Sequence, residues 1–213
     1  MAAFDGEFDL FVSVNEPELA ANVKSELARA LPLARDIVVE SGSPANDAIV
    51  PFAVQFGERL SKYDVVGHFF LKSDSTGKEG ALLDLLIGPV GASSARLAHI
   101  LQSLRQDAKL IYPDGVAYPV QDASFGTTHK HTLTARLLAS HPEFSPEAFP
   151  VIHSPNGSMF WARGDCLQTF FKLPVAYADD AATSLLLEDR LGYALERVLP
   201  ILASSGSGRI YRI

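Results

Sequence analysis

Segments typical of strands and segments typical of helices alternate along this chain, and the alternation restricts its possible folds more than any other feature. The stretch Phe8 to Val14 is rich in aromatic and β-branched residues and predicts a strand. Asn15 then provides a helix start signal, and apolar residues at helical spacing predict a helix from Pro17 to Leu31. A strand followed by a helix is the unit from which parallel sheets are built.

The same order continues along the chain. Further strands are expected at 36–40, 64–71 and 109–112, and helices at 51–60, 81–87 and 94–106. Beyond residue 118 the pattern is less regular, with a helix expected at 132–140, a strand in GSMFWAR, helices at 165–172 and 183–202, and a short terminal strand. No internal repeat or linker is evident. The sequence therefore predicts a single α/β domain over residues 1–213, with a mostly parallel sheet flanked by helices.

The composition restricts the class of protein. The 213 residues are 47% hydrophobic and 20% charged, as in a soluble globular protein with a substantial core. A net charge of −7 without any Lys/Arg run excludes a broad nucleic-acid surface. The single cysteine, Cys166, fits a reducing compartment. The sequence shows neither a signal peptide nor an apolar run of about 20 residues, so we expect a cytoplasmic protein, with peripheral attachment at the inner face of the membrane left open.

Polar loops follow the predicted strands, at the edge of a parallel sheet where ligands bind. The loop residues that we expect to contact a substrate are Asn46, Asp47, Lys72 and Asp114. Loop ends are polar in any α/β protein, so their composition alone does not identify a ligand.

The nine residues PNGSMFWAR combine a turn, an aromatic cluster and a cation. The backbone amides of Gly157 and Ser158 can donate to an oxygen-rich ligand. Trp161 can stack on a sugar ring, and Arg163 can pair with a phosphate. Because side chains alternate along a strand, one of Phe160 and Trp161 is expected to face the core and the other the opposite side. The structural alternatives are burial for Trp161 and an internal ion pair for Arg163.

Patterns typical of other enzyme classes are weak or missing. His129 and His131 form a His-x-His pair with His141 and His153 further along, which leaves a metal-dependent hydrolase as the weakest hypothesis. No Asp-x-Asp pair supports a divalent metal, and no P-loop, dinucleotide fingerprint or Gly-x-Ser-x-Gly elbow occurs. We therefore expect neither a bound metal nor a cofactor.

The order of several motifs gives the chain a resemblance to a known family over nearly its whole length. FDLFVSV, Pro51-Phe52, YDVV, LLDLLIG, YPDG, GSMFWAR and LEDRLGYALERVL follow one another as in the rhamnan synthesis protein F family, and GSMFWAR and ALER are the specific matches. The resemblance implies a nucleotide-sugar glycosyltransferase fold. It also implies transfer of a sugar such as rhamnose from a nucleotide diphosphate donor to a glycan acceptor, in the synthesis of bacterial surface polysaccharide.

The resemblance also suggests catalytic groups. An inverting transferase needs a carboxylate that takes the proton of the acceptor hydroxyl, and positive charge near the departing diphosphate. Glu188 and Asp189 resemble the position where many glycosyltransferases carry that base, and Asp74 is the other candidate. Lys72 and Arg163 would then meet the diphosphate charge. A solvated helix face is the structural alternative for Glu188 and Asp189, and a turn cap is that for Asp74.

A non-catalytic alternative stays open. Before its Pro-Phe pair the family typically carries two arginines, where this chain reads SPANDAIV, and only Lys72 remains of a lysine-rich pattern after the third strand. The second hypothesis, which these departures suggest, is a carbohydrate-binding or assembly domain that has lost the donor site.

Overall fold

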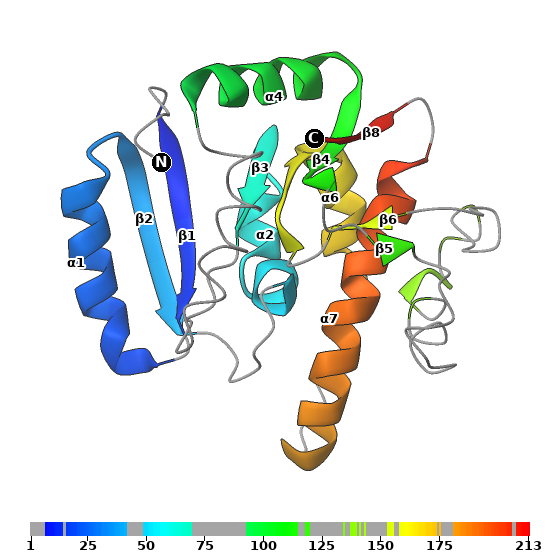
Figure 1. Ribbon diagram of the computed structural model, residues 1–213. Coiled ribbons are helices and arrows are strands. Elements are labelled where there is room, and N and C mark those ends of the chain that lie inside the picture. Colours follow the sequence, from blue (N-terminus) through cyan, green and yellow to red (C-terminus); the bar gives the residue numbers. More distant parts are fainter. Residues whose placement is uncertain are drawn as a thin grey trace.

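The computed structural model describes residues 7–14, 16–41, 49–69, 93–114, 118–119, 134, 137–139, 141, 143, 153–155, 158–173, 175, 181–205 and 208–213. At 118–119 and 181–190 the description covers the backbone alone. The helix expected at 81–87 lies outside these residues, as does most of the one expected at 132–140. The described part is a mixed α/β structure in which a two-stranded unit stands beside a four-stranded sheet (Figure 1).

The N-terminal part is a strand-helix-strand unit. β1 (Phe8–Val14) leads through the 3-10 turn η1 (Pro17–Leu19) into α1 (Ala20–Ala30), and the chain returns as β2 (Ala34–Ser41). The two strands pair in parallel, with Leu10 opposite Ile37. Aromatic and β-branched residues favour the strands, and proline starts the helical segment without losing a hydrogen bond. The predicted strands and helix of this unit are confirmed.

The second sheet has four strands in the order β3-β7-β4-β8. They are β3 (Val65–His68), β7 (Phe160–Arg163), β4 (Ala108–Tyr112) and β8 (Arg209–Arg212). β7 is antiparallel to both neighbours, whereas β8 is parallel to β4. The expected mostly parallel sheet is therefore wrong here, because this sheet is mixed. β6 (His153–Ser154) precedes β7 in the chain, and because β7 is antiparallel to β3 and β4 it starts at the edge where those two strands end.

Helices pack on both faces of this sheet (Figure 1). α4 (Ser94–Gln106) lies on one face, and α6 (Gly164–Phe171) and α7 (Ala181–Ala203) lie on the other. α4 has the predicted bounds, and the Ser93 side chain caps it by accepting from the amide of Arg96 at 3.2 Å. The helix predicted at 51–60 is instead a π-helical segment, η2 (Pro51–Gln55), followed by the short α2 (Gly57–Leu60). A small pair, β5 (Tyr118–Pro119) with β6, is antiparallel. Among the described helices, none is long and apolar enough to cross a membrane.

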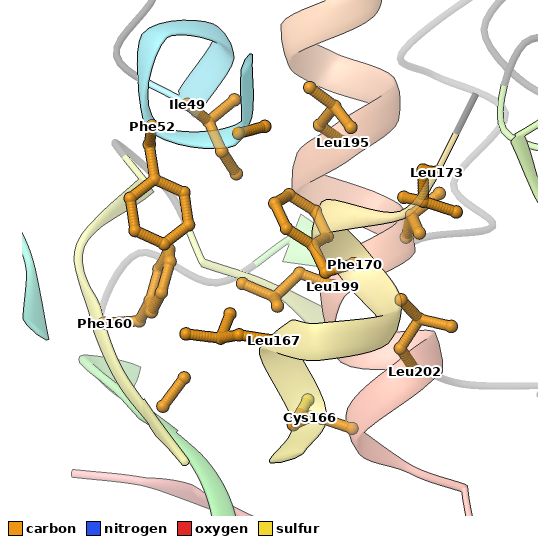
Figure 2. Close-up of a cluster of buried hydrophobic side chains, with 14 of the residues drawn as sticks. Ile49, Phe52, Phe160, Cys166, Leu167, Phe170, Leu173, Leu195, Leu199 and Leu202 are labelled. Carbon is orange, nitrogen blue, oxygen red and sulfur yellow. The ribbon is translucent and has the colours of Figure 1, made fainter. Parts of the chain in front are cut away.

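The main core lies between the sheet and the helices α6 and α7 (Figure 2). Phe160 of β7 is fully buried there against Phe52 of η2, with ring centroids 5.6 Å apart. Leu167 of α6 and Leu199 of α7 lie beside them. Trp161, the next residue of β7, packs instead against the smaller cluster beneath α4. The predicted alternation of Phe160 and Trp161 is confirmed.

Candidate functional site

Ser158 has the most constrained backbone of the described residues. Its φ is 52°, the one positive value for a residue other than glycine in that part of the chain, and the residue is 3% exposed. This left-handed conformation costs a serine roughly 1 kcal/mol. Two contacts hold it: the hydroxyl donates to Oε1 of Glu196, and the carbonyl oxygen lies 2.5 Å from Nδ1 of His68. Strained residues held in this way cluster at binding and active sites.

The contact between Ser158 and Glu196 joins the two motifs that carry the family resemblance, GSMFWAR and ALER. Glu196 lies in the C-terminal half of α7, one turn before Pro200. Because proline has no N–H, Pro200 donates no helical hydrogen bond to the carbonyl of Glu196. The sequence interpretation selected Ser158 and missed Glu196, although the place of Glu196 within ALER was a usable signal.

His68 completes this cluster from the last position of β3. Its ring lies against Phe52 and Phe160, at centroid distances of 4.6 and 5.2 Å. Nδ1 faces a carbonyl oxygen, which can only accept, so we assign the hydrogen to Nδ1. In the neutral ring the lone pair then lies on Nε2. The sequence interpretation gave His68 no role, because it reads as an ordinary strand residue.

Arg197, next to Glu196 on α7, is a buried cation. It is 7% exposed, and within the described part of the chain its Nη1 has no hydrogen-bond partner. Burial lowers the pKa of Arg197, because the charged guanidinium loses contact with water. A buried cation without a full set of acceptors is costly, so an anionic group would stabilise this part of α7. Arg197 was also missed by the sequence interpretation.

Asp114 lies at the same edge of the sheet, just after β4. Its amide donates to the carbonyl of Ile213 at 2.9 Å, and its carboxylate lies 3.4 Å from Nε of Arg212. The side chain is 61% exposed, which leaves it accessible to a ligand. Asp114 therefore stands at the edge where the sequence placed it, and its role in substrate binding stays a prediction.

Arg163 lies at the opposite edge. It is the last residue of β7 and pairs with Val65, the first residue of β3. An extended chain from Ser158 to Arg163 spans roughly 16 Å. Nε and Nη2 of Arg163 each donate to Asp165 at 2.7 Å, and these bonds raise its pKa. The structure therefore does not bring Arg163 together with the turn of GSMFWAR, and the ion-pair alternative describes its contacts.

Glu188 and Asp189 lie on the N-terminal half of α7, where the structure describes the backbone alone. α7 is followed by β8, so its C-terminal end lies towards the edge of the sheet where β8 starts. Because β8 is parallel to β4, the N-terminal half of α7 lies towards the opposite edge, where both strands end. Glu188 precedes Glu196 by about two turns, a rise of roughly 12 Å. In Figure 1 this half of α7, in orange, extends past the strands. Both residues thus lie on the part of the helix that projects beyond the edge where Ser158 is found.

The remaining predicted site residues lie outside the described residues. They are Asn46, Asp47, Lys72, Asp74 and Gly157. Their roles stay predictions. Trp161 is described, and it is partly exposed on the α4 face, with its ring centroid 5.5 Å from that of Phe69.

The described residues contain no group of three His, Cys, Asp or Glu side chains that could hold a metal ion. His129 and His131 lie outside them. His141 has its Nδ1 3.4 Å from Glu143, and the carbonyl of His153 accepts from the Tyr112 hydroxyl at 2.6 Å. These contacts add no support to the hydrolase hypothesis.

A family model covers almost the whole chain. The model described as rhamnan synthesis protein F matches residues 1–207, which include both motifs that meet at Ser158 and Glu196. No curated protein and no solved structure matches the chain. Because the match extends over far more than half of the sequence, the chain belongs to the rhamnan synthesis protein F family.

Proposed function

We propose that this protein is a glycosyltransferase that acts in rhamnan-type polysaccharide synthesis. Family membership links the chain to rhamnan synthesis. The finer step that we propose is transfer of a sugar such as rhamnose from a nucleotide diphosphate donor to a glycan acceptor. We place this reaction in the cytoplasm or at the inner face of the membrane, where the donor and the growing glycan would meet.

One observation carries the proposal: the hydrogen bond between Ser158 and Glu196 at the edge where β3 and β4 end. β3 and β4 run in the same direction on either side of the antiparallel β7, and ligands of open α/β sheets bind outside the carboxyl ends of parallel strands. His68 and Asp114 belong to the same edge. The projecting half of α7 adds two acidic residues, Glu188 and Asp189, on that side of the sheet.

In the proposed reaction, Asp189 or Glu188 accepts the proton of the acceptor hydroxyl as its oxygen attacks the anomeric carbon of the donor sugar. The bond from that carbon to the diphosphate oxygen breaks, and the nucleoside diphosphate leaves with the electron pair. Positive charge stabilises this leaving group. We assign that charge to Lys72 and to Arg197, whose Nη1 has no partner among the described residues.

An assay with purified protein, nucleotide diphosphate sugars and a glycan acceptor tests the proposal. Asp189→Asn and Glu188→Gln are compared separately, and loss of the true base should lower kcat by about 100-fold or more. Glu18→Gln on η1, an exposed acid in the N-terminal unit, is the matched control and should keep the wild-type rate. Wild-type rates in both α7 variants would mean that the base lies elsewhere. Neither transfer nor donor binding by the wild type would overturn the proposal.

A carbohydrate-binding or assembly domain without transferase activity is the second candidate. The ion pair of Arg163 with Asp165 favours it, because it takes one expected cation away from the diphosphate. Thermal unfolding separates the two candidates, since a ligand raises Tm only when it binds the folded state. Nucleotide sugars should raise Tm for a transferase, whereas a binding domain should respond to glycans alone.

A further inference from the structure

Two aromatic side chains form a partly exposed surface at the end of β3. Phe69 directly follows the strand and is 39% exposed. Trp161 lies on β7 opposite Gly67. The rings of Phe69 and Trp161 meet edge to face, with centroids 5.5 Å apart and an interplanar angle of 78°. We call these two side chains the aromatic shelf.

Gly67 allows the indole of Trp161 to lie directly on the backbone of β3. A Cβ at Gly67 would lie 2.7 Å from Cζ3 and 2.9 Å from Cε3 of the indole, closer than real contacts allow. An aromatic ring that covers a glycine of the neighbouring strand supports a sheet, which accounts for Trp161. It does not account for Phe69, a large apolar side chain left exposed at the end of its strand.

The shelf lies near the same edge of the sheet as the cluster around Ser158, but on the face covered by α4, whereas Phe160 and His68 lie on the face covered by α6 and α7. His68 is paired with Phe160, so the continued register places Phe69 level with Met159, the residue after Ser158. Aromatic side chains commonly line ligand sites, so this pair, rather than the exposure of Phe69 alone, makes the shelf a candidate contact for a ligand.

We propose that the aromatic shelf binds a pyranose ring of the glycan acceptor. The C–H groups on one face of a hexose are weakly positive and pack against the negative face of an aromatic ring. A 6-deoxyhexose adds a methyl group to that apolar surface. Membership in a rhamnan synthesis family makes a saccharide the fitting occupant. The inference rests on the proposed function for the identity of the acceptor, whereas stacking of a sugar on the shelf is measurable without transfer.

Trp161 is the only tryptophan of the chain, so its fluorescence reports on the shelf directly. The full chain is titrated with L-rhamnose and with a short rhamnose oligosaccharide, and we expect a saturable change in emission. Phe69→Ala should weaken the affinity by about tenfold, which corresponds to the loss of one good aromatic contact. Gly67→Ala should displace the indole and weaken binding without removing either ring. Leu33→Ala removes an apolar side chain of 44% exposure from the N-terminal unit and should bind as the wild type does.

Circular dichroism establishes that each variant is folded. The proposed role of the shelf would be overturned if Phe69→Ala bound saccharide as the wild type does. It would also be overturned if the wild type showed no saturable change in emission with either saccharide. The transfer assay separates this inference from the proposed function. If the wild type transfers sugar and Phe69→Ala leaves the acceptor KM unchanged, the shelf is wrong and the function stands. If no transfer occurs but Phe69→Ala loses saccharide binding, the shelf stands and the enzyme is rejected.

Discussion

The hydroxyl of Ser158, two residues before β7, donates to the carboxylate of Glu196 on α7, 38 residues further along the chain. This bond ties the start of a central strand to the helix that packs across the sheet. It also holds a serine whose φ of 52° is unfavourable by itself. Contacts from β3 and α7 therefore hold the unfavourable backbone conformation of Ser158.

Replacement of Glu196 by alanine should destabilise the protein more than replacement by glutamine. Alanine leaves the hydroxyl of Ser158, a residue only 3% exposed, without its acceptor, at a cost of about 1–3 kcal/mol. The side-chain carbonyl of glutamine can still accept that bond. Urea unfolding of the two variants measures the difference. Equal losses of stability would show that the bond does not hold the turn.

Gly164→Ala should destabilise the protein far more than Gly208→Ala. A Cβ at Gly164 would lie 1.9 Å from the carbonyl oxygen of Tyr63, a backbone atom that cannot move alone, and we expect a loss of about 3 kcal/mol. At Gly208 the nearest atom is Cδ of Lys109, at 2.2 Å, in a side chain that can shift at the cost of its hydrogen bond to the Ser205 carbonyl. The two glycines thus form a matched pair for urea unfolding. Similar losses would contradict the tight approach of α6 to the segment before β3.

Local signals predicted the elements whose formation is a local matter. α4 has the predicted bounds because its Ser93 cap and its apolar spacing both lie within the segment itself. The direction of β7 could not be predicted in this way, since an extended segment has the same pattern whichever way it runs. That direction depends on the edge at which the chain enters the sheet.

The candidate site was predictable only in part, for a related reason. Ser158 and Arg163 are close in sequence, but the extended backbone between them carries Arg163 to the other edge, roughly 16 Å away. Glu196 is distant in sequence from Ser158 and reaches it through the packing of α7 on the sheet. The composition of GSMFWAR therefore indicated the segment that contains Ser158, but it did not predict that Ser158 contacts Glu196 or that Arg163 lies at the other edge of the sheet.

The stability of the protein should depend on the charge of Asp9. Its carboxylate accepts from Arg35 at 3.1 and 2.8 Å and from the Tyr63 hydroxyl at 2.5 Å, and these bonds, above all that from Arg35, lower the pKa of Asp9. A pKa lowered by folding stabilises the protein above the unfolded value of about 4, and the stabilisation is lost as the pH falls through the lower folded value.

Asp9→Asn should therefore be less stable than the wild type near neutral pH. The difference between their free energies of unfolding should shrink as the pH falls below about 4, where the wild-type carboxylate takes up a proton. Urea unfolding across that range gives the two curves. A difference that does not change with pH would show that the charge of Asp9 contributes nothing to folding.

Cys166 should be unreactive in the folded protein. It is the only cysteine of the chain, it is 6% exposed in the core beside α7, and burial raises the pKa of its thiol to about 12. The reactive thiolate is then almost absent near neutral pH. We expect no labelling by Ellman's reagent under native conditions, and labelling of the single thiol once the protein is denatured.

Because the thiol reacts only after α6 opens, the labelling rate measures the free energy of that opening. Gly164→Ala strains the first residue of α6, whereas the Lys109 side chain can yield to Gly208→Ala. Labelling of Cys166 should therefore be accelerated in the first variant much more than in the second. Rapid and complete labelling of the native wild type would contradict the buried position of Cys166 and, with it, the packing of α6 against the sheet and α7.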